Sequence, residues 1–410
     1  MCSLVVSIGE GCEKKIASVL QYNGKTSLLL YRNSFHLMST PPTFILCSDS
    51  FKGCLSSVAV NAAVCQGVRS VCPEAVVHSL TMSDGGEGFV DAVAACAGGQ
   101  RVVMTAHDPL GRLVDATYLL LDDGTAVIES AATCGMHLVA PEERNPLRCS
   151  SYGLGEMMIE AWRRGCQRMV IGLGGTCTCD AGRGMLRALQ SFFESNADAL
   201  FSDADAFPSG AWQAPCPVMM ACDVDAPLFG QHGAARVFAP QKGATPSMVE
   251  LLEERAIRFA QCSAQCCQRD RSSMPGAGAA GGIGYALMQY LDATQQSGIN
   301  ILLDLYRFDA LLHADTIVVT GEGHADRQTL MGKVPYGILQ RAMKKSADTW
   351  LLAGRIDDEA LLREAGFGRL LCINDVLAPG DDAMNADTAR QNITATMGRA
   401  VTTMLQGTKK

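Results

Sequence analysis

Residues 168–188 form the stretch that most constrains how this chain can fold. An apolar run over residues 169–173 has the composition of a buried strand and leads directly into Gly174, Gly175 and a polar segment. Apolar residues then return at helical spacing from Met185 onward. A strand, a glycine turn and a helix in this order are how α/β proteins present backbone N–H groups to an anion. The same pattern also fits a glycine-rich turn that serves packing alone, so both interpretations stay open.

Length and composition restrict the class of protein. With 410 residues the chain can form two or three domains, and its apolar content of 48% is ordinary for a globular protein. A net charge of −8 argues against a nucleic-acid binder, which needs a basic face. No run of about 18 apolar residues occurs, so we expect no membrane-spanning helix. The 18 cysteines form no Cys-x-x-Cys pair and fit a reducing compartment, which favours the cytoplasm.

The first 42 residues differ in character from the rest of the chain. Glu10 and Glu13 interrupt the opening and argue against a secretory signal. The absence of acidic residues from Lys14 to Ser48 is a weak feature of an organelle presequence, so import into an organelle is the minor alternative. We expect residues 1–42 to be a disordered extension that ends in a linker of Ser, Thr and Pro.

From residue 44 onward, strands and helices are expected to alternate. Apolar runs predict strands at the following positions: 44–47, 76–80, 102–105, 116–121, 126–129, 169–173, 218–221, 301–303, 316–320 and 350–353. Turn signals at 108–111 and 122–124 indicate that part of the middle region is antiparallel. The strand–helix rhythm is therefore interrupted in the middle of the chain and resumes at the end, which is typical of an α/β protein with an insertion.

Several familiar catalytic motifs are absent. The chain contains no G-x-x-x-x-G-K-[ST] phosphate loop and no G-x-S-x-G nucleophile elbow. Residues 276–281 do match G-x-G-x-x-G, but the polar segment before them lacks the strand that a dinucleotide-binding fingerprint requires. A nicotinamide-dependent enzyme is therefore a minor alternative.

The strongest pattern is a set of charged residues at similar positions in the chain rather than any single motif. Acidic residues sit directly after predicted strands or in the loops that follow, and they are Asp49, Asp84, Asp223, Asp225, Glu322 and Asp326. Lys52, Lys242 and Lys333 lie in similar loops. Carboxylates for Mg²⁺, together with lysines and glycine N–H groups for phosphate oxygens, are what phosphoryl transfer needs. Each acid taken singly is better explained as a helix cap or a turn former, but the set favours an active cleft.

These stretches resemble the glycerate kinases of the two-domain type, which are neither P-loop nor ribokinase-like proteins. The matching segments follow the family order across about residues 44–353, and they are SDSFKG (48–53), SDGGEG (83–88), DPLGR (108–112), IGLGGTCTCDAGRGML (171–186), ACDVDAPLFG (221–230), GAARVFAPQKGAT (233–245), PGAGAAGGIG (275–284) and VTGEGHADRQTLMGK (319–333). So many ordered matches are far more specific than any single motif.

The resemblance implies both a fold and an activity. The fold would be α/β, with a Rossmann or flavodoxin-like domain made from residues 43–115 and 315–405 and an inserted α/β domain of mixed sheet at 116–314. The activity would be ATP-dependent phosphorylation of D-glycerate with Mg²⁺; 2-phosphoglycerate is the favoured product, and 3-phosphoglycerate stays open. The resemblance also leaves a homodimer open. Cys179 stands where the family commonly has Asn, and His324 where it has Arg, so a non-catalytic, ligand-sensing relative is the second hypothesis.

Individual roles follow as hypotheses about this chain. For catalysis we expect Lys52, Asp84 and Asp326, with one of the aspartates accepting the proton of the attacking hydroxyl. For nucleotide and phosphate binding we expect Gly174, Gly175, Thr176, Asp180, Gly278 and Gly281. For substrate binding we expect Ser50, Glu322, His324 and Lys333, and for Mg²⁺ we expect Asp223 and Asp225.

Overall fold

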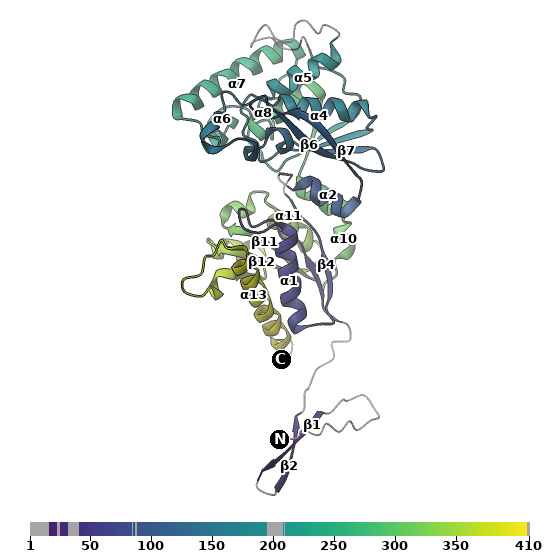
Figure 1. The fold of residues 1–410 in the computed structure, drawn as a ribbon, viewed down its shortest axis with the longest axis vertical. Helices are drawn as coiled ribbons and strands as arrows, with labels where there is room; N and C mark the ends of the chain where they lie inside the picture. The colour runs from purple at the N-terminus through teal and green to yellow at the C-terminus, as the bar shows by residue number, and fades with distance from the viewer. Residues whose placement is uncertain are drawn as a thin grey trace.

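A computed structural model describes residues 16–22, 25–31, 41–83, 85, 86, 88–194, 208 and 210–407. Two sheets with their covering helices form two halves, which lie one above the other along the long axis in Figure 1. Among the described residues, no helix is long and apolar enough to cross a membrane.

The five-stranded sheet is built from both ends of the chain and is entirely parallel. Its strands lie in the order β4 (Val76–Ser79), β3 (Thr43–Leu46), β11 (Ile317–Ala325), β12 (Asp348–Ile356) and β13 (Arg369–Cys372). Read by sequence, this is the order 2-1-3-4-5 of a flavodoxin-like sheet. The order reverses between β3 and β11, and this switch point is where such sheets bind ligands. The predicted flavodoxin-like half is confirmed.

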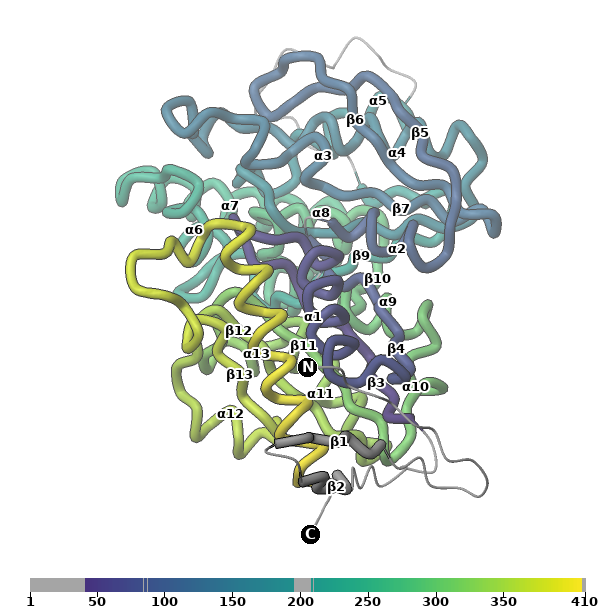
Figure 2. Tube along the Cα trace, turned by 60° about the horizontal axis from the view of Figure 1, so that its bottom comes forward, coloured from purple at the N-terminus to yellow at the C-terminus, as the bar shows by residue number. Residues whose placement is uncertain are grey.

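Alternate residues of β3 face two different helical layers. Phe44 and Leu46 pack against α1 (Ser57–Val71) and α13 (Ala386–Gly407), which lie side by side in front of the sheet in Figure 2. Ile45 points the other way, toward α2 (Phe89–Ala97), α9 (Gly298–Leu305) and α11 (Val334–Met343). Because strand side chains alternate in direction, this short apolar run can bury both faces of the sheet.

The second sheet has six strands and is mixed, as expected. Its order is β10 (Thr294–Gln296), β9 (Val218–Ala221), β8 (Arg168–Gly172), β7 (Thr125–Glu129), β6 (Leu113–Leu120) and β5 (Gln100–His107). The strands from β10 to β7 are parallel, whereas β6 is antiparallel to both of its neighbours. β5 pairs with β6 along its whole length, so the six-stranded sheet begins at residue 100, before the boundary predicted after residue 115.

Both faces of the six-stranded sheet are covered by helices. Met169 and Ile171 of β8 pack with α4 (Tyr152–Arg163), α5 (Arg183–Phe193) and α8 (Ala279–Leu291), and α7 (Pro246–Cys267) lies over α8. Val170 faces the opposite core, which contains α2 and α9 and continues to the five-stranded sheet. The two halves therefore share one apolar core through these two helices.

One predicted strand is wrong. Residues 301–303 belong to α9, whose first turn is capped by the Ser297 hydroxyl accepting the N–H of Asn300. The strand in this region is instead the polar segment β10, which a hydrophobicity pattern does not reveal. The other predicted strands are present, and β11 continues past residue 320 to Ala325. The shorter helices are α3 (Ala131–Cys134), α6 (Ala234–Phe238), α10 (Phe308–Leu311) and α12 (Glu359–Ala365).

Within the predicted N-terminal extension, β1 (Ile16–Tyr22) pairs antiparallel with β2 (Lys25–Tyr31). The rest of the extension, residues 1–15, 23, 24 and 32–40, lies outside the described residues. Neither of the two large sheets includes a strand from the described part of the extension.

Candidate active site

A cleft of about 1230 Å³ opens between the carboxyl ends of strands from both sheets. The loops after β3 and β4 and the segment before α11 contribute from the five-stranded sheet, whereas the ends of β7, β8 and β9 contribute from the other. This places the cleft at the switch point between β3 and β11, the expected ligand site of the flavodoxin-like half.

The loop after β3 brings Ser50 and Lys52 to the cleft. Two buried side chains hold this loop in place: the Ser57 hydroxyl donates to the Ser48 carbonyl at 2.7 Å, and the Asn61 amide oxygen accepts the Ser48 N–H at 3.1 Å. Lys52 is exposed, so its ammonium is available to an anion in the cleft.

The buried carboxylate of Glu322, near the end of β11, forms an ion pair with the partly exposed ammonium of Lys333. One carboxylate oxygen of Glu322 accepts a hydrogen bond from Lys333 Nζ at 2.7 Å, and the other accepts one from the Thr329 hydroxyl at 2.6 Å. The Glu322 side chain is 9% exposed and Lys333 is 36% exposed, and Lys333 lines the cleft. Glu322 therefore positions the lysine rather than facing the ligand itself.

The glycine loop after β8 forms the opposite wall of the cleft with Gly174, Gly175 and Thr176. Lys242, which is only 3% exposed, holds this loop from behind: its Nζ donates to the Thr178 carbonyl at 2.8 Å and to the Thr176 hydroxyl at 3.3 Å. Lys242 also lines the cleft; the sequence pattern included it among the loop lysines, but no individual role was predicted for it. Its place inside the matching segment 233–245 was the available signal.

Asp180 lies at the far end of the same loop, and its carboxylate is engaged within the protein. It accepts hydrogen bonds from the backbone N–H and hydroxyl of Ser151 at 2.9 and 2.8 Å, and from the N–H groups of Gly182 and Gly184 at 3.1 and 3.0 Å. The carboxylate thus joins the start of α4 to the start of α5. It does not line the cleft, and a carboxylate would repel a phosphate, so the structure does not support the predicted phosphate contact.

Cys179, beside it, is buried among apolar side chains that include Ala235 and Leu252. Burial raises the pKa of its thiol, so this residue is a neutral, apolar part of the loop.

The loop over residues 276–282 supports the glycine loop. The Gly281 carbonyl accepts the N–H of Ala181 at 3.0 Å, and the Gly278 N–H donates to the Ala226 carbonyl at 2.8 Å. Neither glycine lines the cleft, although Ala279 and Ala280 do. Because no strand precedes this loop, it lacks the context of a dinucleotide-binding fingerprint.

Asp223 follows β9 and lines the cleft. One of its carboxylate oxygens accepts the N–H of Gly298 at 3.1 Å. Asp225 is exposed and does not line the cleft. In the part of the chain that the structure describes, no three His, Cys, Asp or Glu side chains lie close enough together to hold a metal ion. Mg²⁺ commonly takes only one or two carboxylates plus waters and substrate phosphates, and Asp223 fits that pattern.

His324 and Asp326 do not line the cleft. His324, whose side chain is 49% exposed, contacts Asp357 through Nε2 at 2.8 Å, and this hydrogen bond lowers the pKa of Asp357 below its usual value. The Asp326 carboxylate accepts the N–H of Gln328 at 2.8 Å and caps a short helical turn. Asp84, the remaining predicted residue, lies outside the described residues.

The structure therefore brings together part of the predicted site. Lining the cleft are Ser50, Lys52, Gly174, Gly175, Thr176, Asp223 and Lys333. Glu322 holds Lys333, while Asp180, Gly278 and Gly281 lie behind the glycine loop. A flavodoxin-like half, an inserted mixed sheet and a cleft lined by lysines and a glycine loop define a two-domain α/β protein whose cleft suits an anionic ligand.

Comparison with known proteins identifies the family. Residues 44–405 match the model of the glycerate kinase family. The chain therefore belongs to the glycerate kinase family, and it is an enzyme of the kinase class.

The matching region covers nearly the full length of the named relatives. A glycerate 2-kinase from Escherichia coli is 35% identical over 370 residues, which cover 86% of this chain and 97% of the relative. A glycerate kinase from Bacillus subtilis is 37% identical over 351 residues, which cover 83% and 92%. A crystal structure of a glycerate kinase 2 from Salmonella typhimurium superposes with a TM-score of 0.71 at 34% identity and covers 90% of this chain and all of its own.

Proposed function

We propose that this enzyme transfers the γ-phosphoryl group of ATP to the 2-hydroxyl of D-glycerate within the cleft, with Mg²⁺ as the metal. The observation that carries the proposal is that Lys52, Lys333, Asp223 and the glycine loop line one cavity although they come from distant parts of the sequence. The 2-position rests on the name of the Escherichia coli relative, a glycerate 2-kinase. Phosphoryl transfer depends mainly on positioning and charge neutralisation, which such a cleft provides.

The lysines and the glycine loop would divide the anionic groups between them. Gly174, Gly175 and Thr176 present the turn after β8 to the nucleotide phosphates, as glycine turns before helices do in other phosphate sites. Lys52 and Lys333 would hold the glycerate carboxylate and the γ-phosphate from the opposite wall. Glu322 keeps the Lys333 ammonium in place through the 2.7 Å ion pair.

Asp223 is the residue we assign to Mg²⁺, since it is the one of the two predicted metal ligands that lines the cleft. When bound, the metal supplies charge neutralisation for the phosphate oxygens. Asp84 and Asp326 remain the two hypotheses for the group that accepts the hydroxyl proton. Asp326→Asn should lower turnover by about 10²–10⁴ if this aspartate is the base, and a loss within about tenfold would reject it.

Phosphorus NMR of the reaction mixture tests activity and product together. Purified protein with ATP, Mg²⁺ and D-glycerate should produce ADP and a new phosphomonoester resonance, coupled to the C2 proton of 2-phosphoglycerate. A resonance coupled to the C3 protons would overturn the 2-position and leave the kinase proposal standing. Protein that binds ATP but forms no glycerate-dependent phosphomonoester would favour the non-catalytic hypothesis.

A pair of lysine variants ties the activity to the cleft. Lys333→Met removes a cation that lines the cleft, and we expect kcat/KM to fall by about 10²–10³, the usual effect of losing one preorganised charge-stabilising group. Lys344→Met removes an exposed lysine at the other end of α11 and should leave kcat/KM unchanged. Equal activity in the two variants would contradict the assignment of Lys333.

A further inference from the structure

Asn61 is a polar residue buried within α1. It is the fifth residue of the helix, and it is only 1% exposed. Asparagine is less favourable than an apolar residue inside a helix, and a buried amide is costly unless it is hydrogen-bonded. Asn61 does not line the cleft, so its place is explained by partners within the protein.

The partners of Asn61 are backbone groups at the ends of two neighbouring strands. Its Oδ1 accepts the N–H of Ser48, after β3, at 3.1 Å, and its Nδ2 donates to the carbonyl of Leu80, after β4, at 2.9 Å. Ser57, one turn earlier on α1, makes a second bridge. Its hydroxyl donates to the Ser48 carbonyl at 2.7 Å and accepts the N–H of Met82 at 3.1 Å.

These two bridges stand where a parallel ladder would have direct hydrogen bonds. At the end of the β3–β4 pairing, the Leu80 N–H donates to the Leu46 carbonyl at 2.8 Å. Continued in the same register, the ladder would join the Ser48 N–H to the Leu80 carbonyl, and the Met82 N–H to the Ser48 carbonyl. Instead, one side chain lies between the two groups of each pair.

We call Ser57 and Asn61 the strand spacer, because they separate the two strand ends while keeping these backbone groups hydrogen-bonded. The loops that follow the two strands both belong to the cleft: Lys52 lies on one, and Thr81 and Met82 lie on the other. The strand spacer therefore sets the distance between two parts of the cleft wall.

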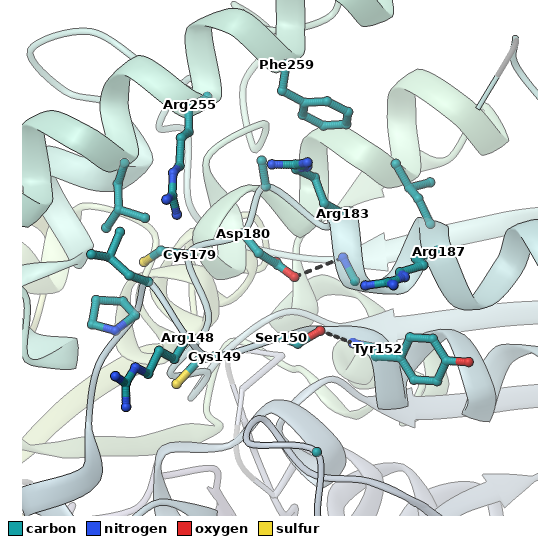
Figure 3. Close-up of a pocket in the computed structure, with 18 of the residues that line it drawn as sticks. Arg148, Cys149, Ser150, Tyr152, Cys179, Asp180, Arg183, Arg187, Arg255 and Phe259 are labelled. Atoms are coloured by element: carbon teal, nitrogen blue, oxygen red, sulfur yellow. Dashed lines mark hydrogen bonds between the residues drawn. The ribbon is translucent and has the colours of Figure 1, made fainter. Parts of the chain in front are cut away.

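A side chain also holds backbone groups in place in the inserted half. In Figure 3 the Asp180 carboxylate accepts the N–H of Gly184, near the start of α5, at 3.0 Å. A carboxylate suits a helix start, where the N–H groups lack partners within the helix. Asn61 has a different task, since it accepts a hydrogen bond from one strand end and donates one to the other. An amide can do both, whereas an ionised aspartate only accepts and a leucine does neither.

The loop that carries Lys52 is tightly closed, so it follows Ser48 as a unit. Phe51 and Leu55 exchange two backbone hydrogen bonds at 2.8 and 2.9 Å, and Lys52 lies in the turn between them. The hydrogen bond from Ser57 to Ser48 closes the base of the loop. A change in the distance between the strand ends therefore displaces the lysine, and a misplacement of about 1 Å can cost about 10²-fold in rate.

We propose that Asn61 is a positioning residue for phosphoryl transfer: as part of the strand spacer, it sets the place of Lys52 in the cleft relative to the loop after β4. This inference rests on the proposed function, in which Lys52 holds an anionic group of the substrates. The effect of Asn61 on the reaction passes through the backbone of Ser48, because Asn61 itself does not line the cleft.

Steady-state kinetics of Asn61→Ala, alone and combined with Lys52→Met, test this role. Asn61→Ala should lower kcat/KM for ATP by about tenfold to a hundredfold. In the Lys52→Met background, it should lower kcat/KM by less than about threefold, because effects that act through one group are not additive. Full additivity of the two substitutions, or an unchanged kcat/KM in Asn61→Ala, would overturn the proposal.

Val68→Ala is the matched control for a general loss of stability. Val68 lies two turns further along α1 and is fully buried against the five-stranded sheet. Its truncation leaves a cavity, so Tm should fall, while kcat/KM stays within about twofold of wild type. All variants are assayed at a temperature at which circular dichroism shows them fully folded. An equal loss of kcat/KM in Val68→Ala and Asn61→Ala would show a merely structural role and overturn the proposal.

A crystal structure of Asn61→Ala gives a test that does not need activity. The Ser48 nitrogen and the Leu80 carbonyl oxygen should approach to about 3 Å, the distance of a direct ladder bond. A water molecule in place of the amide, with the strand ends still apart, would overturn the spacer. Wild-type protein that does not phosphorylate glycerate would refute the proposed function, and the crystal structure would still decide whether Asn61 separates the strands.

If Asn61→Ala fails to fold, Ser57→Ala gives the same decision. It removes the other bridge, so the Met82 nitrogen and the Ser48 carbonyl oxygen should approach each other, and kcat/KM should fall non-additively with Lys52→Met. Ser70→Ala is its control, because Ser70 also lies on α1 and its hydroxyl donates only to the Gly67 carbonyl of that helix, at 2.8 Å. Equal kinetics in the two serine variants would overturn the proposal.

Discussion

Lys242 is the residue that most directly links folding to the site. A buried ammonium is costly unless its donors are satisfied, and Lys242 donates to the Thr178 carbonyl and the Thr176 hydroxyl without a carboxylate partner among its hydrogen bonds. Because Lys242 also lines the cleft, an anion bound there would supply the compensating charge. We therefore expect the buried lysine to cost stability in the free protein and to strengthen the binding of an anion in the cleft.

Replacing Lys242 by Met separates these two effects. We expect the free energy of unfolding to change by no more than about 1 kcal/mol, since the loss of two hydrogen bonds is offset by relief of the desolvation cost. The kcat/KM for ATP should fall at least tenfold, about 1.4 kcal/mol in transition-state binding. Thermal unfolding and steady-state kinetics measure both quantities. A large loss of stability with unchanged kinetics would show that Lys242 is only a structural residue.

Residue types alone could not assign roles to the acidic side chains. The sequence pattern placed Asp180 with the phosphates, yet its carboxylate accepts hydrogen bonds from Ser151 and two glycines. An aspartate after a glycine turn looks the same in both roles, because the outcome depends on donors that lie far away in the sequence. Lys52, Lys333 and Asp223 do line the cleft, as a strand-end position in a parallel sheet predicts.

At the scale of elements, the glycine loop after β8 depends on close backbone approach. A Cβ added to Gly174 would lie 2.5 Å from the Cα of Gly86, in the loop that follows β4. The loops after β4 and β8 therefore touch through glycine. Each loop belongs to a different half of the molecule and forms part of the cleft wall, so this contact joins the two walls.

Gly174→Ala should therefore disturb both stability and activity. Overpacking of this kind costs about 1–3 kcal/mol, which corresponds to a fall of several degrees in Tm for a protein of this size. Since the two loops must separate, we also expect kcat/KM to fall at least tenfold. Gly407→Ala is the control, because a Cβ there has no atom within 4 Å. Wild-type Tm and kinetics in Gly174→Ala would contradict the close contact.

Strands with a buried apolar run of four or five residues were predictable, whereas a three-residue apolar run and a polar strand were not. The apolar run at 169–173, for example, predicted β8 to within one residue. The apolar run at 301–303 was taken for a strand, because three apolar residues fit a strand and a helix turn equally well. The strand β10 carries only Thr and Gln and is held by its pairing to β9, which no local pattern reveals.

At the scale of the whole molecule, the described strands of the N-terminal extension, β1 and β2, pair only with each other and belong to neither large sheet. A chain that begins at residue 41 should therefore keep its Tm within about 2 °C and its kcat unchanged, as thermal unfolding and steady-state assays would show. Deleting α13 is the contrasting case, because Ile393, Met397 and Val401 on this helix are fully buried against the five-stranded sheet. That deletion should prevent folding. Loss of folding on removal of residues 1–40 would contradict this division.

The pairing of β3 with β11 also sets an order of events during synthesis. On the ribosome, β3 and β4 emerge early, but the strand that lies beside β3 begins only at residue 317. Every strand of the inserted sheet leaves the exit tunnel before that point. The inserted sheet can therefore form before the five-stranded sheet is complete. Until β11 has been synthesised, the edge of β3 that pairs with it stays unpaired, and we expect a chaperone to bind there.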